Sequence, residues 1–199
     1  MGIIMSCDFF AYISRMKYIT RWSLMRSTER ENIQEHSHMA AVLAHALGLI
    51  RRDVFGRECD VDALAAAALY HDAPEILTGD LPTPIKYHSR SIKTAYDEVE
   101  DVAIAKLLSG LPEQLRPAYK KLLTASRRPE EYTLVKAADT LSAYIKCVEE
   151  RRAGNREFLS AEAASLEKLL AMRLPEVEYF LENFMPGFEK NLDELETLE

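Results

Sequence analysis

The segment NIQEHSHMAAVLAHALGLIR, residues 32–51, decides the fold. Its apolar side chains recur every three or four residues on one face that also carries His36: Ile33, Ala40, Leu43, Leu47 and Ile50. This is the period of an amphipathic helix packed against a core. Asn32 and Glu35 stand at the spacing of a capping box, which marks the helix start. The pattern therefore predicts a helix over 32–51 that turns His36 inward.

Apolar periodicity predicts further helices on both sides of this segment, over residues 7–18, 61–73, 89–109, 112–124, 129–152, 156–172 and 175–184. An irregular stretch around Arg21, Trp22 and Arg26 precedes the helix at 32–51. Residues 78–84, with one Gly and two Pro, read as a loop, and the acidic tail 193–199 reads as a frayed end. We expect an all-α protein, a helical bundle forming a single domain over residues 1–199.

Composition narrows the partners and the location. The net charge of -7 predicts no nucleic-acid polymer and no anionic membrane as partner, because both are normally met by a basic surface. The three cysteines are far apart and form no CxxC pair, which indicates reduced thiols. We find no signal peptide and no apolar run near the roughly 20 residues of a membrane-spanning helix. A cytoplasmic protein is expected.

Three polar features interrupt apolar helical faces: His36, the pair His71-Asp72, and Asp139. Burying a lone carboxylate is costly unless it is paired or binds a metal. Two imidazoles and two carboxylates from different helices can instead share one divalent ion and leave positions open for water and substrate. The joint pattern therefore favours a metal site.

Each feature taken alone has a simpler interpretation. A single His on a helix face is more often a hydrogen-bonded core or boundary residue, and we place His38, His45 and His88 in that class. Asp139 alone would more often be a surface residue of a helix. Only the combination of the four side chains favours their interpretation as a set of metal ligands.

The ordered motifs of the chain resemble a known family. Glu35-His36-Ser37, His71-Asp72 and Lys136-Ala-Ala-Asp139 look like the metal signature of HD-domain phosphohydrolases. A closer resemblance, to bacterial 5'-deoxynucleotidases of the YfbR type, rests on further segments of the sequence: RW at 21–22, ENIQEHS at 31–37, YHDA at 70–73, LTGDLPTP at 77–84 and AYIKCVEE at 143–150. This likeness covers nearly the whole chain. It departs at Pro74, where a small polar residue is expected.

The resemblance implies a metal-dependent hydrolase of deoxyribonucleoside 5'-monophosphates, with little base selectivity and discrimination against ribonucleotides. It implies one divalent ion per chain, such as cobalt or manganese, held by His36, His71, Asp72 and Asp139. It also implies that Glu75 is the catalytic acid or base, three residues from Asp72 and four from His71. The alternative for Glu75 is a solvent-exposed acid opening a short helix after Pro74.

The same resemblance assigns the substrate contacts. Arg21 is expected to orient the phosphate, since a guanidinium can bond two phosphate oxygens. Trp22 would pack on the sugar and leave little room for a 2'-hydroxyl; its alternative is a core anchor. The remaining expected substrate contacts are the metal ligands Asp72 and Asp139 and the loop residues Asp80, Leu81, Pro82 and Thr83. A plain turn is the alternative for Asp80.

Two rival functions stay open at this point. An HD enzyme acting on a nucleoside triphosphate or guanosine tetraphosphate would need several cations, whereas the regions around the motifs offer mainly Arg21, Arg26, Lys86 and Arg90. A non-catalytic metal- or nucleotide-binding HD protein is the second rival. The resemblance also implies a homodimer, to which the predicted helix 175–184 offers apolar surface.

Overall fold

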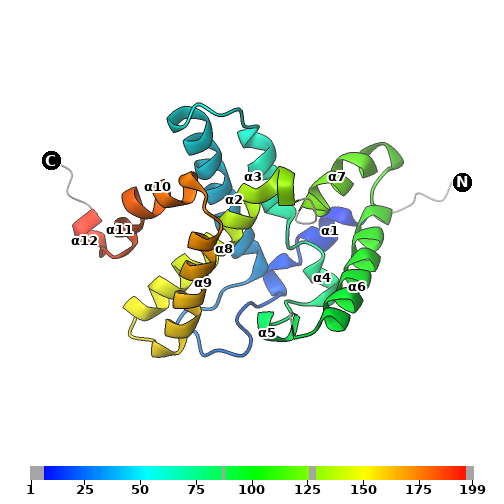
Figure 1. Ribbon diagram of the computed structural model, residues 1–199. Helices are drawn as coiled ribbons and strands as arrows, with labels where there is room; N and C mark the ends of the chain where they lie inside the picture. The colour runs from blue at the N-terminus through cyan, green and yellow to red at the C-terminus, as the bar shows by residue number, and fades with distance from the viewer. Residues whose placement is uncertain (1–6, 87, 126–128, 196–199) are drawn as a thin grey trace, which may run out of the picture.

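The computed structural model describes residues 7–86, 88–125 and 129–195, without the side chains of Thr83 and of residues 129–131. Within these ranges the chain is helical, and its one β-type pairing is an isolated bridge between Thr20 and Asn32. The fold class is therefore all-α, as predicted (Figure 1). The α-helices are α1 Phe9–Ile13, α2 Ile33–Leu49, α3 Val61–Tyr70, α4 Glu75–Thr78, α5 Thr83–Lys86, α6 Arg90–Ser109, α7 Arg116–Leu123, α8 Pro129–Arg152, α9 Leu159–Ala171, α10 Pro175–Asn183, α11 Met185–Phe188 and α12 Leu192–Leu195.

The centre of the molecule is built by α2, α3 and α8, which pack against one another. Leu47 of α2 and Leu141 of α8 are fully buried in their shared apolar cluster. Gly48 lets α2 and α3 approach closely, since a Cβ there would lie 3.2 Å from a methyl group of Val61. This tight packing matters for function because all three helices carry or immediately precede predicted metal ligands.

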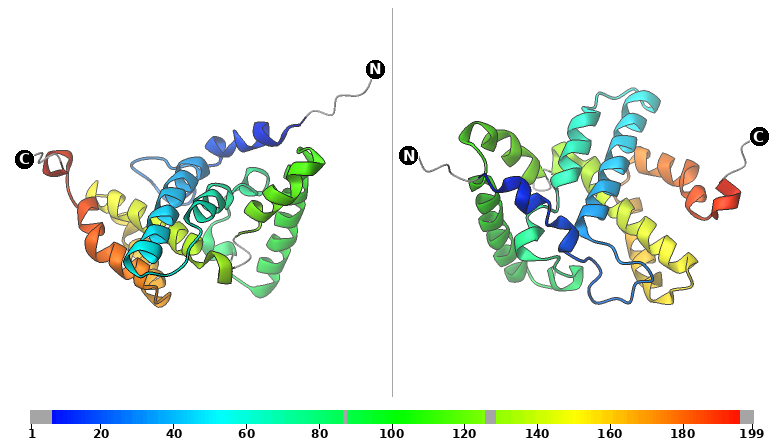
Figure 2. Two further views of the ribbon diagram at one scale, coloured as in Figure 1. Left: turned by 90° about the horizontal axis from the view of Figure 1, so that it is seen from above. Right: turned by 180° about the vertical axis from the view of Figure 1, so that it is seen from behind.

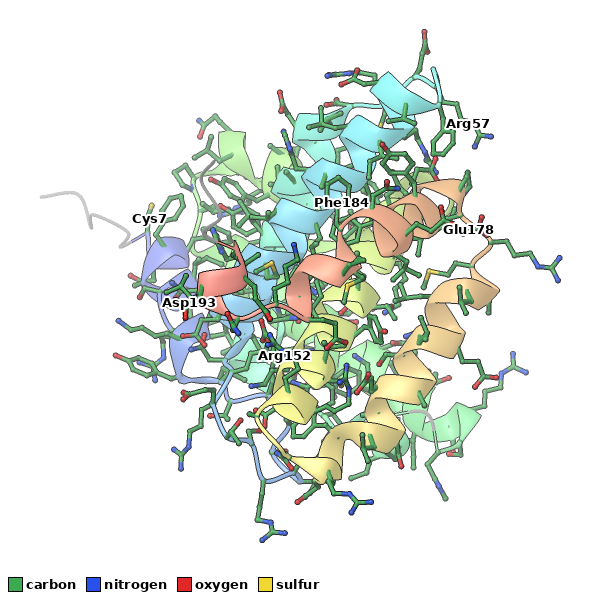
Figure 3. The ribbon with its side chains drawn as sticks, turned by 90° about the vertical axis from the view of Figure 1, so that its left-hand side faces the viewer. Cys7, Arg57, Arg152, Glu178, Phe184 and Asp193 are labelled. Atoms are coloured by element: carbon green, nitrogen blue, oxygen red, sulfur yellow. The ribbon has the colours of Figure 1, made fainter. Side chains whose placement is uncertain are left out.

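Shorter elements flank this centre on two sides. On one side, α1, α6 and α7 surround a second apolar cluster that includes Phe9 and Leu107. On the other, α10 and α11 pack on α2, α9 and α8 (Figure 3). Arg152, at the end of α8, holds this C-terminal part by donating to the carbonyl oxygens of Phe188 and Lys190. No helix among the described residues is long and apolar enough to cross a membrane.

Several predicted helix bounds need correction. The predicted helix 7–18 is split into α1 and a 3-10 turn, Met16–Tyr18, and α2 ends in a π-helical turn, Ile50–Val54. The helix predicted to reach residue 73 ends at Tyr70, and its last residues form turns. The predicted loop 78–84 overlaps the ends of α4 and α5, two short helices that periodicity cannot reveal. The predicted frayed tail begins inside α12, and residues 196–199 lie outside the described part.

The irregular stretch predicted around Arg21 is confirmed, and we call residues 19–32 the Arg21 loop. It runs beside the C-terminal end of α8 (Figure 2, right). The carboxylate of Glu150, 1% exposed, accepts from the backbone N–H and hydroxyl of Thr28 at 2.8 and 2.7 Å, and from Lys146 at 2.6 Å. Lys146 also donates to the carbonyl of Glu29. A buried ion pair thus ties the loop to the core.

Replacing Glu150 with glutamine is expected to destabilise the protein by about 3–5 kcal/mol, because it leaves the Lys146 ammonium buried without its counter-charge. Burial alone would raise the pKa of Glu150, but the hydrogen bonds from Lys146, Thr28 and Asn155 lower it to about 2. Its stabilising contribution should therefore be complete above pH 4.5 and be lost as the pH falls toward 2. Urea unfolding at pH 7 measures the effect. Glu149→Gln, a change of the adjacent exposed carboxylate, is the control, and equal midpoints for both variants would contradict the prediction.

Candidate active site

The four predicted metal ligands come from three packed elements. His36 lies in the first turns of α2, His71 and Asp72 form the turn after α3, and Asp139 lies in α8. The capping box predicted for α2 is present, with the Asn32 side chain accepting from the Glu35 N–H and Glu35 reaching back to the Asn32 N–H. It begins the helix so that His36 is fully buried on its inner face, as predicted. The fold thus brings together side chains up to 103 residues apart in sequence (139 minus 36).

The side chains converge at short range. The Nε2 atom of His36 lies 3.2 Å from Asp139 Oδ1 and 3.5 Å from Asp72 Oδ2. The Nε2 atom of His71 lies 3.2 Å from Asp72 Oδ1 and 3.9 Å from Asp139 Oδ1. Asp72 therefore bridges the two imidazoles with its two oxygens. All four predicted ligands face one small volume.

The donor set fits a divalent cation. His36, His71 and Asp139 each offer a ligand atom within 4.8 Å of the others, and Asp72 lies beside them. Both Nε2 atoms are buried and make no hydrogen bond with any residue that the structure describes. Each Nδ1 is held from behind, by the Ser142 hydroxyl at 3.1 Å for His36 and by the Ala68 carbonyl at 2.6 Å for His71. Hydrogen bonds of this kind, to the ring nitrogen that faces away from the ion, orient metal-binding histidines.

The electrostatics of the cluster reflect two carboxylates facing two imidazoles. Burial acts to lower the pKa of His71, but Asp72 and Asp139 outweigh it and raise that pKa to about 10. Burial acts to raise the pKa of each aspartate, yet the histidines, with Arg21 for Asp72 and Lys136 for Asp139, hold both pKa values below the usual range. The carboxylates are thus anionic and suited to a cation.

Arg21 and Trp22 lie at the edge of this cluster. Arg21 donates through Nη1 to Asp72 Oδ2 at 3.2 Å and through Nε to Glu31 Oε2 at 3.1 Å. Trp22 is half-buried, packs its ring on Phe158 at a centroid distance of 5.3 Å, and donates from Nε1 to Glu31 Oε2 at 2.8 Å. The core-anchor interpretation of Trp22 is therefore incomplete, since one side of the residue also lines a cavity.

Glu75 opens α4 and is 7% exposed, which corrects the alternative of a solvent-exposed acid. Pro74 does not displace it: the proline has helical backbone angles, φ −58° and ψ −27°, and the Glu75 N–H donates to the Asp72 carbonyl. Among the described residues, Glu75 Oε2 is buried and has no hydrogen-bond partner. Burial, reinforced by the negative charges of Asp72 and Asp80, raises the pKa of Glu75 well above its ordinary value.

A cavity of about 1020 Å³ opens over these groups. Its wall includes Arg21, Trp22, His71, Asp72, Glu75, Asp80, Leu81, Pro82 and Asp139. The volume is at the upper end of the roughly 300–1,000 Å³ typical of small-ligand pockets. Ten of the eleven predicted site residues can be placed by their side chains, and nine of these line the cavity while His36 is buried beneath it. The side chain of the eleventh, Thr83, lies outside the described part.

Sequence reasoning misjudged some residues around the cavity. Arg26 is exposed and pairs with Glu157, so it is not a site cation, whereas three further lysines line the wall: Lys93, Lys136 and Lys168. His38, His45 and His88 are solvent-exposed and not core or boundary residues. The supports Glu31 and Ser142 received no role from the sequence. For Ser142, its position three residues after Asp139 in α8 was an available signal.

Comparisons with known proteins show the family to which the chain belongs. The sequence pattern of the family described as 5'-deoxynucleotidase YfbR-like matches residues 8–188. A protein of Erwinia tasmaniensis named 5'-deoxynucleotidase is 49% identical over 189 residues, covering 94% of this chain and 95% of the relative. One of Yersinia pestis with the same name is 48% identical over the same shares.

Solved structures give the same picture of the fold. An HD-domain phosphohydrolase from Listeria innocua superposes with a TM-score of 0.80 at 25% identity, covering 91% of this chain and 88% of that one. The HD phosphohydrolase of cyanophage S-2L, described as bound to dA and one catalytic Zn²⁺, superposes with a TM-score of 0.63 at 21% identity over 89% and 96%. The chain is thus an HD-domain hydrolase that belongs to the YfbR-like 5'-deoxynucleotidase family, as its sequence motifs predicted.

Proposed function

We propose that this protein hydrolyses deoxyribonucleoside 5'-monophosphates to deoxyribonucleosides and phosphate, with little base selectivity and with discrimination against ribonucleotides. The observation that carries the proposal is the convergence of His36, His71, Asp72 and Asp139 beneath a cavity that Arg21, Trp22 and Glu75 also line. The family supplies the reaction class.

The four convergent side chains would hold one divalent ion, and cobalt or manganese is proposed. Such an ion supplies positive charge to a phosphoryl oxygen and makes a water molecule more acidic. The protein's own part is to fix the imidazoles through Ser142 and Ala68 and to keep two carboxylates anionic. The neighbour bound to one catalytic Zn²⁺ supports a metal of this kind.

Glu75 is proposed as the general acid or base. Its buried carboxyl holds a proton more tightly than an exposed glutamate does, so it can return a proton to the leaving 5'-oxygen of the nucleoside. Its ionised form can take a proton from the attacking water. The Glu75 N–H donates a hydrogen bond to the carbonyl of Asp72, on the preceding turn, and this bond fixes Glu75 relative to the ligands.

Arg21 is proposed to bind the phosphate, and the loop residues Asp80, Leu81, Pro82 and Thr83 to close over the nucleoside, with Asp80 accepting from the 3'-hydroxyl. Asp72 and Asp139 would contact the phosphate as well. The guanidinium keeps its charge, because Asp72 and Glu31 raise the pKa of Arg21 despite its burial. Low base selectivity is consistent with the apolar part of the wall, which includes Val135, Ala143 and Ala161.

The deciding test is phosphate release from a panel of deoxy- and ribonucleoside mono-, di- and triphosphates, each assayed with several divalent metals after chelation. Release of inorganic phosphate from deoxynucleoside monophosphates, with ribonucleotides hydrolysed more slowly, is expected. The lysines in the cavity wall make the triphosphate arm necessary. Pyrophosphate or triphosphate as the main product would overturn the proposal, and nucleotide binding without turnover would favour a non-catalytic HD protein.

Trp22→Ala is expected to narrow the preference for deoxyribose over ribose by about tenfold, because it removes the ring that limits space at the 2' position. The ratio of kcat/KM values for a deoxy- and a ribonucleotide of the same base measures this. Phe158→Leu, which removes the aromatic partner beneath Trp22 but not the indole itself, should change the ratio less. A ratio unchanged in Trp22→Ala would locate sugar selection elsewhere.

Three sequence predictions complete this proposal. We propose that the chain works as one HD domain over residues 1–199, as a homodimer, and in the cytoplasm. Size-exclusion chromatography with light scattering tests the second. Limited proteolysis of the whole chain tests the single domain, and cell fractionation tests the cytoplasmic location.

A further inference from the structure

The carboxylate of Glu31 joins the two residues that are proposed to recognise the phosphate and the sugar. A single oxygen, Oε2, accepts from Arg21 Nε at 3.1 Å and from Trp22 Nε1 at 2.8 Å. The Glu31 side chain is 13% exposed, so water competes little for this oxygen. Glu31 itself is not among the residues that line the cavity. It therefore acts on both neighbours from behind.

The backbone around Glu31 connects it firmly to the metal cluster. Arg21 N–H donates to the Glu31 carbonyl at 2.9 Å, and the Ile33 N–H donates to the Ile19 carbonyl at 3.0 Å, so the two ends of the Arg21 loop are held together. Glu31 lies two residues before α2, whose first turns carry His36. Arg21 makes a second contact, to Asp72. The position of Glu31 is thus set by the same helix that places a predicted ligand.

Trp22 needs such support because its backbone is strained. Its φ of 57° lies in the left-handed region, which a bulky non-glycine residue rarely adopts. Strained residues of this kind persist only where surrounding contacts hold them. Three side chains among the described residues contact Trp22: the Glu31 carboxylate, the Phe158 ring, and the Arg21 guanidinium, which lies 6.0 Å from the indole centroid. The Phe158 ring packs against the indole at an interplanar angle of 60°, whereas the hydrogen bond to Glu31 fixes the direction in which the indole Nε1 points.

We propose that Glu31 is a positioning residue that sets sugar selectivity by holding Trp22 while it holds Arg21. This inference rests on the proposed function, in which those two side chains contact the substrate. The simpler alternative makes Glu31 only a counter-ion for Arg21. The two differ in outcome, because a counter-ion affects phosphate binding alone, whereas the shared oxygen also affects the choice between deoxyribose and ribose.

The chain offers a direct readout, because Trp22 is its only tryptophan. Intrinsic fluorescence of the full-length protein, excited at a wavelength that its nine tyrosines do not absorb, therefore reports the environment of this indole alone. Glu31→Ala removes the acceptor and is expected to shift the emission maximum of Trp22. It should also lower the deoxyribose-to-ribose ratio of kcat/KM by about tenfold, near the value of Trp22→Ala. Glu31→Gln keeps an acceptor oxygen and should retain most of both properties.

Two further variants provide a control and a test of whether Glu31 acts through Trp22. Glu29→Ala removes an exposed carboxylate from the same loop and should leave emission and ratio at wild-type values. In the double variant Glu31→Ala/Trp22→Ala the ratio should fall no further than in Trp22→Ala, because Glu31 acts through Trp22. Additive losses would show an independent route and would overturn the inference.

The failure of this inference is distinguishable from failure of the proposed function. If Trp22→Ala changes the ratio but Glu31→Ala changes neither ratio nor emission, Glu31 is not the positioning residue. An emission shift in Glu31→Ala with an unchanged ratio would overturn it as well. If Trp22→Ala itself leaves the ratio unchanged, the proposed role of Trp22 fails, and with it the inference. If circular dichroism shows that Glu31→Ala does not fold, Glu31→Leu replaces it as the variant without an acceptor oxygen and is compared with Glu31→Gln.

Discussion

Replacing Glu75 with glutamine is expected to lower kcat by about 10²–10⁴-fold, the usual contribution of a general acid or base. Glutamine keeps the size of the side chain but cannot transfer a proton. Because Glu75 is separate from the four predicted metal ligands, the metal content of the purified variant should equal that of the wild type. Steady-state phosphate release and elemental analysis of the same preparations measure the two quantities.

The stability of the variant separates a chemical from a structural effect. Glu75 is buried, and this burial raises the pKa of its carboxyl, so the site already favours a neutral side chain and an amide of the same size should cost the fold little. We therefore expect an unfolding midpoint close to that of the wild type. Glu100→Gln, which removes another carboxylate from the cavity wall, is the control for charge. Wild-type turnover in Glu75→Gln would remove Glu75 from the mechanism.

The parts of the site that apolar periodicity could predict are those carried by regular helices, whereas the loop residues were predicted only through the family resemblance. The three-and-four spacing of α2 turned His36 inward, and its full burial follows from that pattern. The capping signal at Asn32 and Glu35 located the helix start, and both of its hydrogen bonds are present. Asp139 stood out because a carboxylate interrupts an apolar helical face, which needs a partner to be stable. Periodicity and the cost of buried charge thus carry this half of the site.

The rest of the site depends on contacts that no local pattern encodes. The Arg21 loop has no periodic apolar face, and it is held by Glu150 of α8, 122 residues after Thr28. Glu31 appeared only as one letter of a motif, because its importance comes from the shared oxygen between Arg21 and Trp22. Pro74 departs from the family pattern, but a proline is tolerated at the start of α4, where its missing N–H has no helical partner.

Asp139→Asn is the variant that should most directly test the metal site. The amide has almost the same shape as the carboxylate but lacks its negative charge, so the site loses an anionic ligand without losing volume. We expect the affinity for a divalent ion to fall by more than the roughly 10–100-fold that is lost when a residue hydrogen-bonded to a metal ligand is removed. Activity should fall with it, and adding back metal after chelation should restore the wild type but not the variant.

Ser142→Ala provides the graded comparison, because Ser142 contacts His36 Nδ1 from behind without facing the predicted ion. Its metal affinity should fall by about 10–100-fold, less than in Asp139→Asn, and excess metal should restore its activity. Metal titrations followed by calorimetry, with cobalt, manganese and zinc in parallel, rank the wild type, Ser142→Ala and Asp139→Asn by metal affinity. If the four side chains share an ion, Asp139→Asn must lose more metal affinity than Ser142→Ala, because a direct ligand contributes more than the residue that orients one. An Asp139→Asn protein that binds one equivalent of metal as tightly as the wild type would show that the four side chains meet for structural reasons alone.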